Sequence, residues 1–127
     1  MRERQGESGG IGLRNALAGL AVLHWTQKNA RIHAAATVAV LVTGIWFGLS
    51  AGDWIWIGLA VGLVWMAEAL NTAIELLADA AVPQEHPLVG KAKDVAAGGV
   101  LLAAVTAAFI GTLVLGPPLL RIIAEMT

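Results

Sequence analysis

The sequence contains no cysteine, and only 13% of its 127 residues are charged. The absence of cysteine excludes disulfides, thiolate catalysis and a cysteine-ligated metal site. The low charge content argues against a soluble domain, in which about a quarter of the residues are charged. The formal net charge of −1 gives the chain no overall attraction for nucleic acid. Hydrophobic residues make up 57% of the chain, which favours a membrane protein.

Three apolar segments reach the ~20 residues that a membrane-spanning helix needs. We predict these spans at about 32–50, 54–80 and 94–116. A tight turn over Ser50–Asp53 connects the first two, and a polar loop over residues 83–94 connects the last two. Gly116–Pro118 should end or kink the third span, because proline cannot donate the backbone hydrogen bond of a helix. The pattern predicts an all-α membrane protein.

The segment before the first span is less apolar. Residues 1–10 are charged and rich in glycine, so we expect them to be disordered. Residues 11–30 have leucines at helical spacing, with polar residues between them, which predicts a helix on the membrane surface or a short cytosolic helix packed under the bundle. We expect no cleaved signal peptide, because no short apolar region with a small-residue cleavage site follows the N-terminal charges. Residues 11–127 are predicted to form one integral-membrane domain.

The distribution of lysine and arginine predicts the orientation of the chain. Five of these residues precede the first span: Arg2, Arg4, Arg14, Lys28 and Arg31. The turn between the first two spans has none, whereas the loop between the last two contains Lys91 and Lys93. The positive-inside rule therefore places the N-terminus and this loop in the cytoplasm. Trp46, Trp54 and Trp56 then gather at the opposite interface, where indole rings prefer to lie.

The most informative feature of the sequence is a row of polar residues in the second span. Its members share one helical face, an arc of about 80°. They are Glu68, Asn71, Glu75 and Asp79. Ionisable residues in a membrane helix are costly and usually functional, and a row that only joined helices would be served by asparagine or serine at lower cost. We interpret this row, the acidic stripe, as a functional site at the cytoplasmic end of the span.

The residue types in and after the acidic stripe suit chemistry on a phosphate. Carboxylate and amide oxygens bind hard divalent cations, and a carboxylate can take a proton from a hydroxyl group during a transfer reaction. Lys93 could neutralise phosphate charge, and Asp94 could hydrogen-bond a ribose or orient the lysine. Basic residues in a loop are often only markers of topology, but their proximity to the stripe favours a Mg²⁺-nucleotide site. The sequence contains neither a P-loop nor the protein-kinase motifs, so such a site would be of an unrelated kind.

Together these motifs resemble those of the prokaryotic diacylglycerol kinase family, which includes the undecaprenol kinases. The matching segments are EALNTAIELLAD at 68–79, HPLVGKAKDVAAG at 86–98 and TQKNARIH at 26–33. The resemblance covers about residues 11–115. It implies a homotrimeric helical bundle, with an N-terminal surface helix and three transmembrane helices per chain and active sites shared between neighbouring subunits. It also implies an enzyme of the bacterial cytoplasmic membrane that transfers the γ-phosphate of ATP to a lipid hydroxyl group.

The resemblance also implies roles for individual residues. Glu68 matches the general base, and Glu75 matches a ligand of the required divalent ion, normally Mg²⁺. The matches to the nucleotide site are Asn71, Glu75, Asp79, His86, Lys93, Asp94 and Arg14. Among these, Lys93 is expected at the phosphates, with Asp79 and Asp94 around the nucleotide.

One position departs from the family pattern. Gln27 stands where the family has a glutamate that shares the metal with the residue matching Glu75. A glutamine carbonyl can still ligate a cation but adds no charge, so metal affinity should fall. Two interpretations therefore remain open, an active lipid kinase or a catalytically degenerate member that serves as a pseudokinase or interaction protein. An ion or proton pathway built on the acidic stripe is disfavoured, because it would not need Lys93 and Asp94.

The lipid substrate is left open between undecaprenol and diacylglycerol. The His-Pro-Leu sequence at 86–88 and the Asn-x-Arg-Ile-His sequence at 29–33 look more like the undecaprenol kinase branch. Lipid specificity depends on the shape of an apolar groove, which the linear sequence does not reveal.

Overall fold

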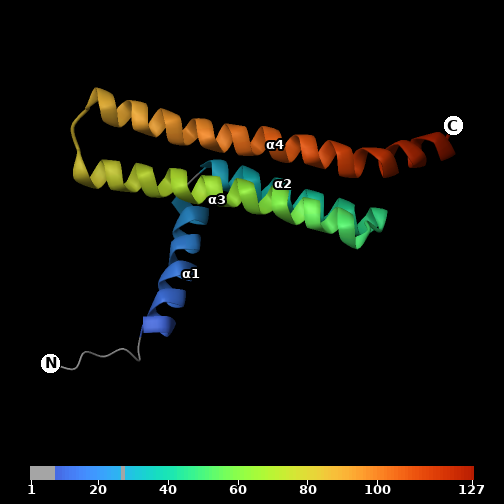
Figure 1. The fold of residues 1–127 in the computed structure, drawn as a ribbon, viewed down its shortest axis with the longest axis horizontal. Helices are drawn as coiled ribbons and strands as arrows, with labels where there is room; N and C mark the ends of the chain where they lie inside the picture. The colour runs from blue at the N-terminus through green and yellow to red at the C-terminus, as the bar shows by residue number, and fades with distance from the viewer. Residues whose placement is uncertain (1–7, 27) are drawn as a thin grey trace.

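The computed structural model describes residues 8–26 and 28–127. Four helices make up this part of the chain: α1 (Ser8–Thr26), α2 (Lys28–Phe47), α3 (Ala51–Ala81) and α4 (Pro87–Glu125). Helices α3 and α4 lie side by side in opposite directions, α2 packs against them, and α1 projects steeply away (Figure 1). No strand occurs in the described residues. The predicted all-α class, with a first helix followed by three long apolar ones, is confirmed.

Helices α2, α3 and α4 are each long and apolar enough to cross a membrane. At 1.5 Å per residue, the 31 residues of α3 and the 39 residues of α4 extend about 46 Å and 58 Å. Both lengths exceed the ~30 Å hydrocarbon core of a bilayer. The C-terminal turns of α3 and the N-terminal turns of α4 extend together past α2 (Figure 1). These turns, which carry part of the acidic stripe, can therefore reach the headgroup region or water.

The turn between α2 and α3 is built from residues suited to a sharp reversal. Gly48 has a φ of 65°, a conformation that side-chain-bearing residues rarely adopt. Ser50 and Asp53 then form a capping box, in which each side chain accepts a hydrogen bond from the other's backbone N–H at 3.2 Å. Gly44 allows close approach, because a Cβ there would lie 2.9 Å from the Trp54 ring. The turn thereby holds α2 tightly against the start of α3.

Helix α4 begins earlier than predicted. It starts at Pro87, so the segment up to residue 94, expected to be part of a polar loop, is helical from that point. Proline suits the first position of a helix, where its missing N–H would have no intrahelical partner. His86 caps this end, because its Nδ1 accepts a hydrogen bond from Leu88 N at 3.3 Å. As a result, Lys93 and Asp94 lie on a regular helix rather than on a loop.

Two other helix boundaries also differ from expectation. Pro117 and Pro118 lie inside α4, which continues to Glu125. The expectation that they end the helix is therefore wrong, and the other expected effect is a kink. The C-terminal end of α4 changes direction in Figure 1, as expected where consecutive prolines remove hydrogen bonds to the preceding turn. Helix α1 begins at Ser8, so the expected disorder of residues 1–10 does not hold for 8–10. Residues 1–7 lie outside the described part.

The interior of a single chain is small. The buried apolar side chains lie mainly between α3 and the other long helices: Leu23, Ala30, Ile57, Ala60, Val64, Val100 and Ala103. Many large apolar side chains on α2, α3 and α4 are exposed, for example Ile45, Leu77 and Phe109. Exposed apolar side chains on every long helix fit surroundings of hydrocarbon or of further apolar helices rather than water.

Two consecutive hydrogen bonds link α2 to α3 inside the span. Trp65 Nε1 donates to Thr37 Oγ1 at 3.1 Å, and Thr37 Oγ1 donates in turn to the carbonyl oxygen of His33 at 2.7 Å. Between membrane helices such bonds satisfy polar groups that hydrocarbon cannot. These bonds fix the position of α2 along the axis of α3.

Replacing Trp65 by Phe should weaken this connection. The variant loses the indole donor but keeps most of the apolar ring surface. We expect the free energy of unfolding to fall by about 0.6 kcal/mol, and by no more than about 1.7 kcal/mol, measured by denaturation of the detergent-solubilised protein. Trp56→Phe is the control, because Trp56 is 56% exposed. An equal loss in both variants would contradict a stabilising role for the bond.

Candidate active site

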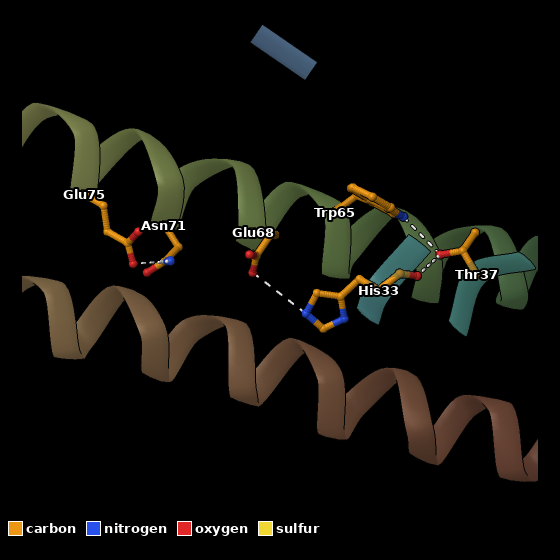
Figure 2. Close-up of polar contacts among 6 residues, drawn as sticks. All are labelled: His33, Thr37, Trp65, Glu68, Asn71 and Glu75. Carbon is orange, nitrogen blue, oxygen red and sulfur yellow. Dashed lines mark hydrogen bonds and ion pairs between the residues drawn. The ribbon is translucent and has the colours of Figure 1, made fainter. Parts of the chain in front are cut away.

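The side chains of Glu68, Asn71 and Glu75 lie on one face of α3 and turn toward α4 (Figure 2). Glu68 is 1% exposed and Asn71 is 5% exposed, whereas Glu75 is half-buried. Thr72, which follows Asn71, is also buried. Three members of the acidic stripe thus share one buried face, and their burial decreases toward the end of the helix.

Glu68 faces a histidine from α2. Glu68 Oε2 lies 3.8 Å from His33 Nε2, within the distance of an ion pair when the imidazole is protonated (Figure 2). The contact depends on the packing of α2 against α3 that Trp65 and Thr37 maintain. A carboxylate this deeply buried is stabilised by such a basic neighbour.

Further along the stripe, several polar atoms lack partners. Asn71 Nδ2 donates to Glu75 Oε1 at 3.0 Å, which uses the donor of the amide but not its oxygen. Among the described residues, Glu68 Oε2, Asn71 Oδ1 and Thr72 Oγ1 are buried without a hydrogen-bond partner. Each such atom costs about 1–3 kcal/mol. The three oxygens therefore keep hydrogen-bonding capacity that no described side chain uses.

A cavity of about 270 Å³ lies over the stripe between α2, α3 and α4. His33, Asn71 and Glu75 form its polar side. Its α4 side is apolar and includes the small residues Ala97 and Ala104, which leave the space open. We call it the stripe cavity. It is large enough to admit water or a small polar group beside the Glu75 carboxylate.

A second cavity, of about 260 Å³, extends from His33 toward the middle of the span. Its lining is almost entirely apolar and includes Val40, Ile57 and Val64. His33 and Ala104 line this apolar cavity as well as the stripe cavity. The two spaces therefore adjoin at His33, the residue that faces the buried Glu68 carboxylate. One has polar side chains on one wall, and the other is suited to hydrocarbon.

The end of the stripe forms a separate cluster at the loop between α3 and α4. Lys93 Nζ donates to Asp79 Oδ1 as an ion pair, and both side chains line a cavity of about 530 Å³ with His86 and the loop residues. The pair is solvent-exposed, with Asp79 68% exposed. Exposed ion pairs are worth little for stability, so both groups can exchange partners when an anion binds.

The remaining predicted nucleotide residues are not brought to the stripe within one chain. Arg14 lies exposed on α1, and Asp94 is exposed on α4. Among the described residues, no hydrogen bond or ion pair joins Arg14, His86 or Asp94 to Glu68 or Asn71. Gln27, predicted as a metal ligand, lies outside the described residues.

His33 is the site residue that reasoning from the sequence did not assign. A lone histidine at the start of a span gives no sign of its partner, which here comes from another helix. The one sequence feature that could have pointed to His33 is its place at the end of the TQKNARIH segment, which resembles the family's segment before the first span.

The residues of the stripe fit a hard divalent cation by donor type. Glu75 supplies a carboxylate, and the buried Asn71 Oδ1 without a partner shows that oxygen ligands are available beside it. Within residues 8–26 and 28–127, however, no three acidic or histidine side chains come together as a complete ligand set.

Comparison with known proteins adds to this geometry. A family model described as "Prokaryotic diacylglycerol kinase" matches residues 14–115. An undecaprenol kinase of Bacillus subtilis is 44% identical over 94 residues, which are 74% of this chain and 76% of that protein. A diacylglycerol kinase of Synechocystis is 42% identical over 113 residues, 88% of this chain and 65% of that protein. A diacylglycerol kinase of Escherichia coli K12 is 32% identical over 84 residues, 65% of this chain and 69% of that protein.

The bond between Asn71 and Glu75 can be tested by placing a carboxylate at position 71. Asn71→Asp removes the amide donor and brings a second negative charge beside Glu75 in a poorly solvated site. We expect this variant to lose about 2 kcal/mol or more of unfolding free energy, measured by denaturation in detergent. Asn71→Ala is the matched control, since it removes the same donor without adding charge. If the alanine variant is equally unstable, repulsion of Glu75 is not the cause.

Proposed function

Because the chain belongs to the prokaryotic diacylglycerol kinase family, we propose that it transfers the γ-phosphate of ATP to the hydroxyl group of a membrane lipid. The family and the named relatives are lipid kinases. The resemblance to this family inferred from the motifs is therefore confirmed. The observation that carries the proposal is Glu68, a carboxylate buried in a membrane-length helix with one oxygen that makes no hydrogen bond. Such a group is costly and is expected where it has a chemical role.

Glu68 acts as the general base in this proposal. Its carboxylate takes the proton of the lipid hydroxyl while the hydroxyl oxygen attacks the γ-phosphorus and ADP leaves. The position of Glu68 supports this role, because Val64, one turn away on α3, lines the apolar cavity while Asn71 lines the stripe cavity. A lipid headgroup could therefore reach the carboxylate with its chain in apolar surroundings and its hydroxyl beside polar atoms.

The nucleotide is proposed to bind toward the loop end of the stripe. Lys93 would exchange its contact with Asp79 for the phosphates of ATP, where a cation offsets charge on the phosphoryl oxygens. The other proposed nucleotide contacts are Arg14, Asn71, Glu75, Asp79, His86 and Asp94. Bound Mg²⁺, held by Glu75 and Gln27, would neutralise phosphate charge and orient the transferred group.

The proposed lipid is undecaprenol or diacylglycerol. The relatives carry both names, at 44% and 42% identity, so the similarity does not separate the two substrates. The segments at 86–88 and 29–33 favour undecaprenol. Comparing the rates at which the protein phosphorylates the two lipids would test this preference.

We further propose a homotrimer in the bacterial cytoplasmic membrane, with the N-terminus in the cytoplasm and residues 11–127 forming the single kinase domain. The exposed apolar side chains of α2, α3 and α4 support lipid contacts and helix packing between chains. The lysines of the α3–α4 loop region and the positive charges before the first span support the orientation.

Replacing Glu68 by Gln should abolish turnover while leaving the fold intact. We expect the rate to fall by about 10²- to 10⁴-fold, because the amide cannot accept the hydroxyl proton. Purified protein in detergent would be supplied with ATP, Mg²⁺ and either undecaprenol or diacylglycerol, and phosphorylated lipid measured. Glu125→Gln, the same change at the exposed end of α4, is the control. A Glu68→Gln variant that keeps more than about a tenth of the rate would show that Glu68 is not the base.

Replacing Gln27 by Glu tests whether the site is degenerate. A second carboxylate should bind Mg²⁺ more tightly than an amide, because a divalent cation in a poorly solvated site gains more from a charged ligand. We expect a lower half-saturating Mg²⁺ concentration and higher activity at limiting metal. Gln5→Glu controls for added charge near the N-terminus. An unchanged midpoint would remove position 27 from the metal site, and a wild-type protein inactive with both lipids would favour the degenerate alternative.

A further inference from the structure

Glu68 needs a way to lose the proton that it accepts. A general base that takes a proton in every cycle must release it before the next lipid can react. The Glu68 side chain is only 1% exposed, so water does not reach it freely. Another group must therefore carry the proton from the carboxylate toward water.

His33 lies where such a group is needed. Its Nε2 is 3.8 Å from Glu68 Oε2, about 0.6 Å beyond the hydrogen-bond range, so a small side-chain movement closes the gap. Its side chain is 17% exposed, and it lines the stripe cavity. An imidazole ring can accept a proton at one nitrogen and release a proton from the other.

The helices hold this histidine in place. Thr37 Oγ1 binds the carbonyl of His33 at 2.7 Å and accepts from Trp65 Nε1 at 3.1 Å. Trp65 lies one turn before Glu68 on α3, so the turns that carry the histidine and the carboxylate are tied together (Figure 2). The imidazole is thereby kept opposite the carboxylate.

Among the side chains that the structure describes, no second basic group lines the stripe cavity beside Glu68. The α4 residues that line the stripe cavity are all apolar: Ala97, Val100, Leu101 and Ala104. The other ionisable residue on the cavity wall is Glu75, which comes from α3 and accepts a hydrogen bond from Asn71. Within the described part of the chain, His33 is the basic side chain paired with Glu68.

We propose that His33 takes the proton from Glu68 after each phosphoryl transfer and returns the carboxylate to its ionised form. This inference rests on the proposed kinase function. In the transfer, the lipid O–H bond breaks, a bond forms between the lipid oxygen and the γ-phosphorus, and the bond to the bridging oxygen breaks with its electron pair leaving on ADP. The hydroxyl proton passes to Glu68 Oε2 and then to His33 Nε2, and the imidazolium releases its Nδ1 proton to water. Exchange of the remaining proton from Nε2 to Nδ1 through water then frees Nε2 to accept again in the next cycle. His33 acts through Glu68, so it is a positioning residue rather than a catalytic one.

His33→Gln separates this role from a structural one. Glutamine can hydrogen-bond to Glu68 but cannot carry a proton. The first turnover uses a carboxylate that is already ionised, so rapid-quench measurement should show a burst of about one phosphorylated lipid per active site, followed by a steady-state rate lower by about tenfold or more. The KM values for ATP and lipid should stay within about twofold of wild type. A wild-type steady-state rate in this variant, or a first turnover slowed as much as later ones, would overturn the proposal.

His33→Ala provides a second, independent test. Removing the imidazole enlarges the stripe cavity of about 270 Å³, so added imidazole can occupy the vacated space. Imidazole should raise the steady-state rate of His33→Ala but not that of His33→Gln; failure to do so would contradict a proton-carrying role. Val38→Ala, at a 60% exposed position of α2, should behave as wild type. Wild-type protein that phosphorylates no lipid would overturn the proposed function together with this inference, whereas normal activity with unaffected His33 variants overturns this inference alone.

Discussion

The cost of placing charge among apolar helices governs the arrangement of this site. A carboxylate in a membrane helix is tolerated only where another group or water compensates it. Along α3 the compensation changes with position: Glu68 is buried against His33, Glu75 is half-buried and bonded to Asn71, and Asp79 is exposed and paired with Lys93. One helical face therefore presents three acidic groups in three different environments. In the proposed function, the same residue type would serve as a base at one end and as a nucleotide contact at the other.

The neighbouring helices leave space beside the α3 face that carries the acidic stripe. Small residues on α4 leave the stripe cavity open, and the close approach of α2 brings His33 to Glu68. The apolar cavity extends from His33 toward the middle of the span. The cavity of about 530 Å³ that Asp79 and Lys93 line, here called the loop cavity, lies at the C-terminal end of α3. For the proposed reaction, this arrangement lets a lipid and a nucleotide approach the stripe from opposite directions along the same helix.

Reasoning from the sequence succeeded where one helix fixes the geometry. The common face of Glu68, Asn71 and Glu75 follows from 3.6 residues per turn, and it does not depend on neighbouring elements. The pairing of His33 with Glu68 could not be derived in this way, because it depends on how far α2 slides along α3. The start of α4 at Pro87 was missed for a local reason, since proline was treated as a loop residue although it suits the first helical turn.

The structure of one chain also bears on how the site is completed. A nucleotide carries several negative charges, and the loop cavity offers Lys93, already paired with Asp79. Arg14, the other described cation proposed for the nucleotide, lies exposed on α1, which points away from the bundle (Figure 1). In the proposed homotrimer a projecting helix of this kind can reach a neighbouring chain, while the exposed apolar faces of the long helices pack together. Assembly would then do two things at once, covering apolar surface and bringing a cation to a site whose own chain supplies mostly acidic groups.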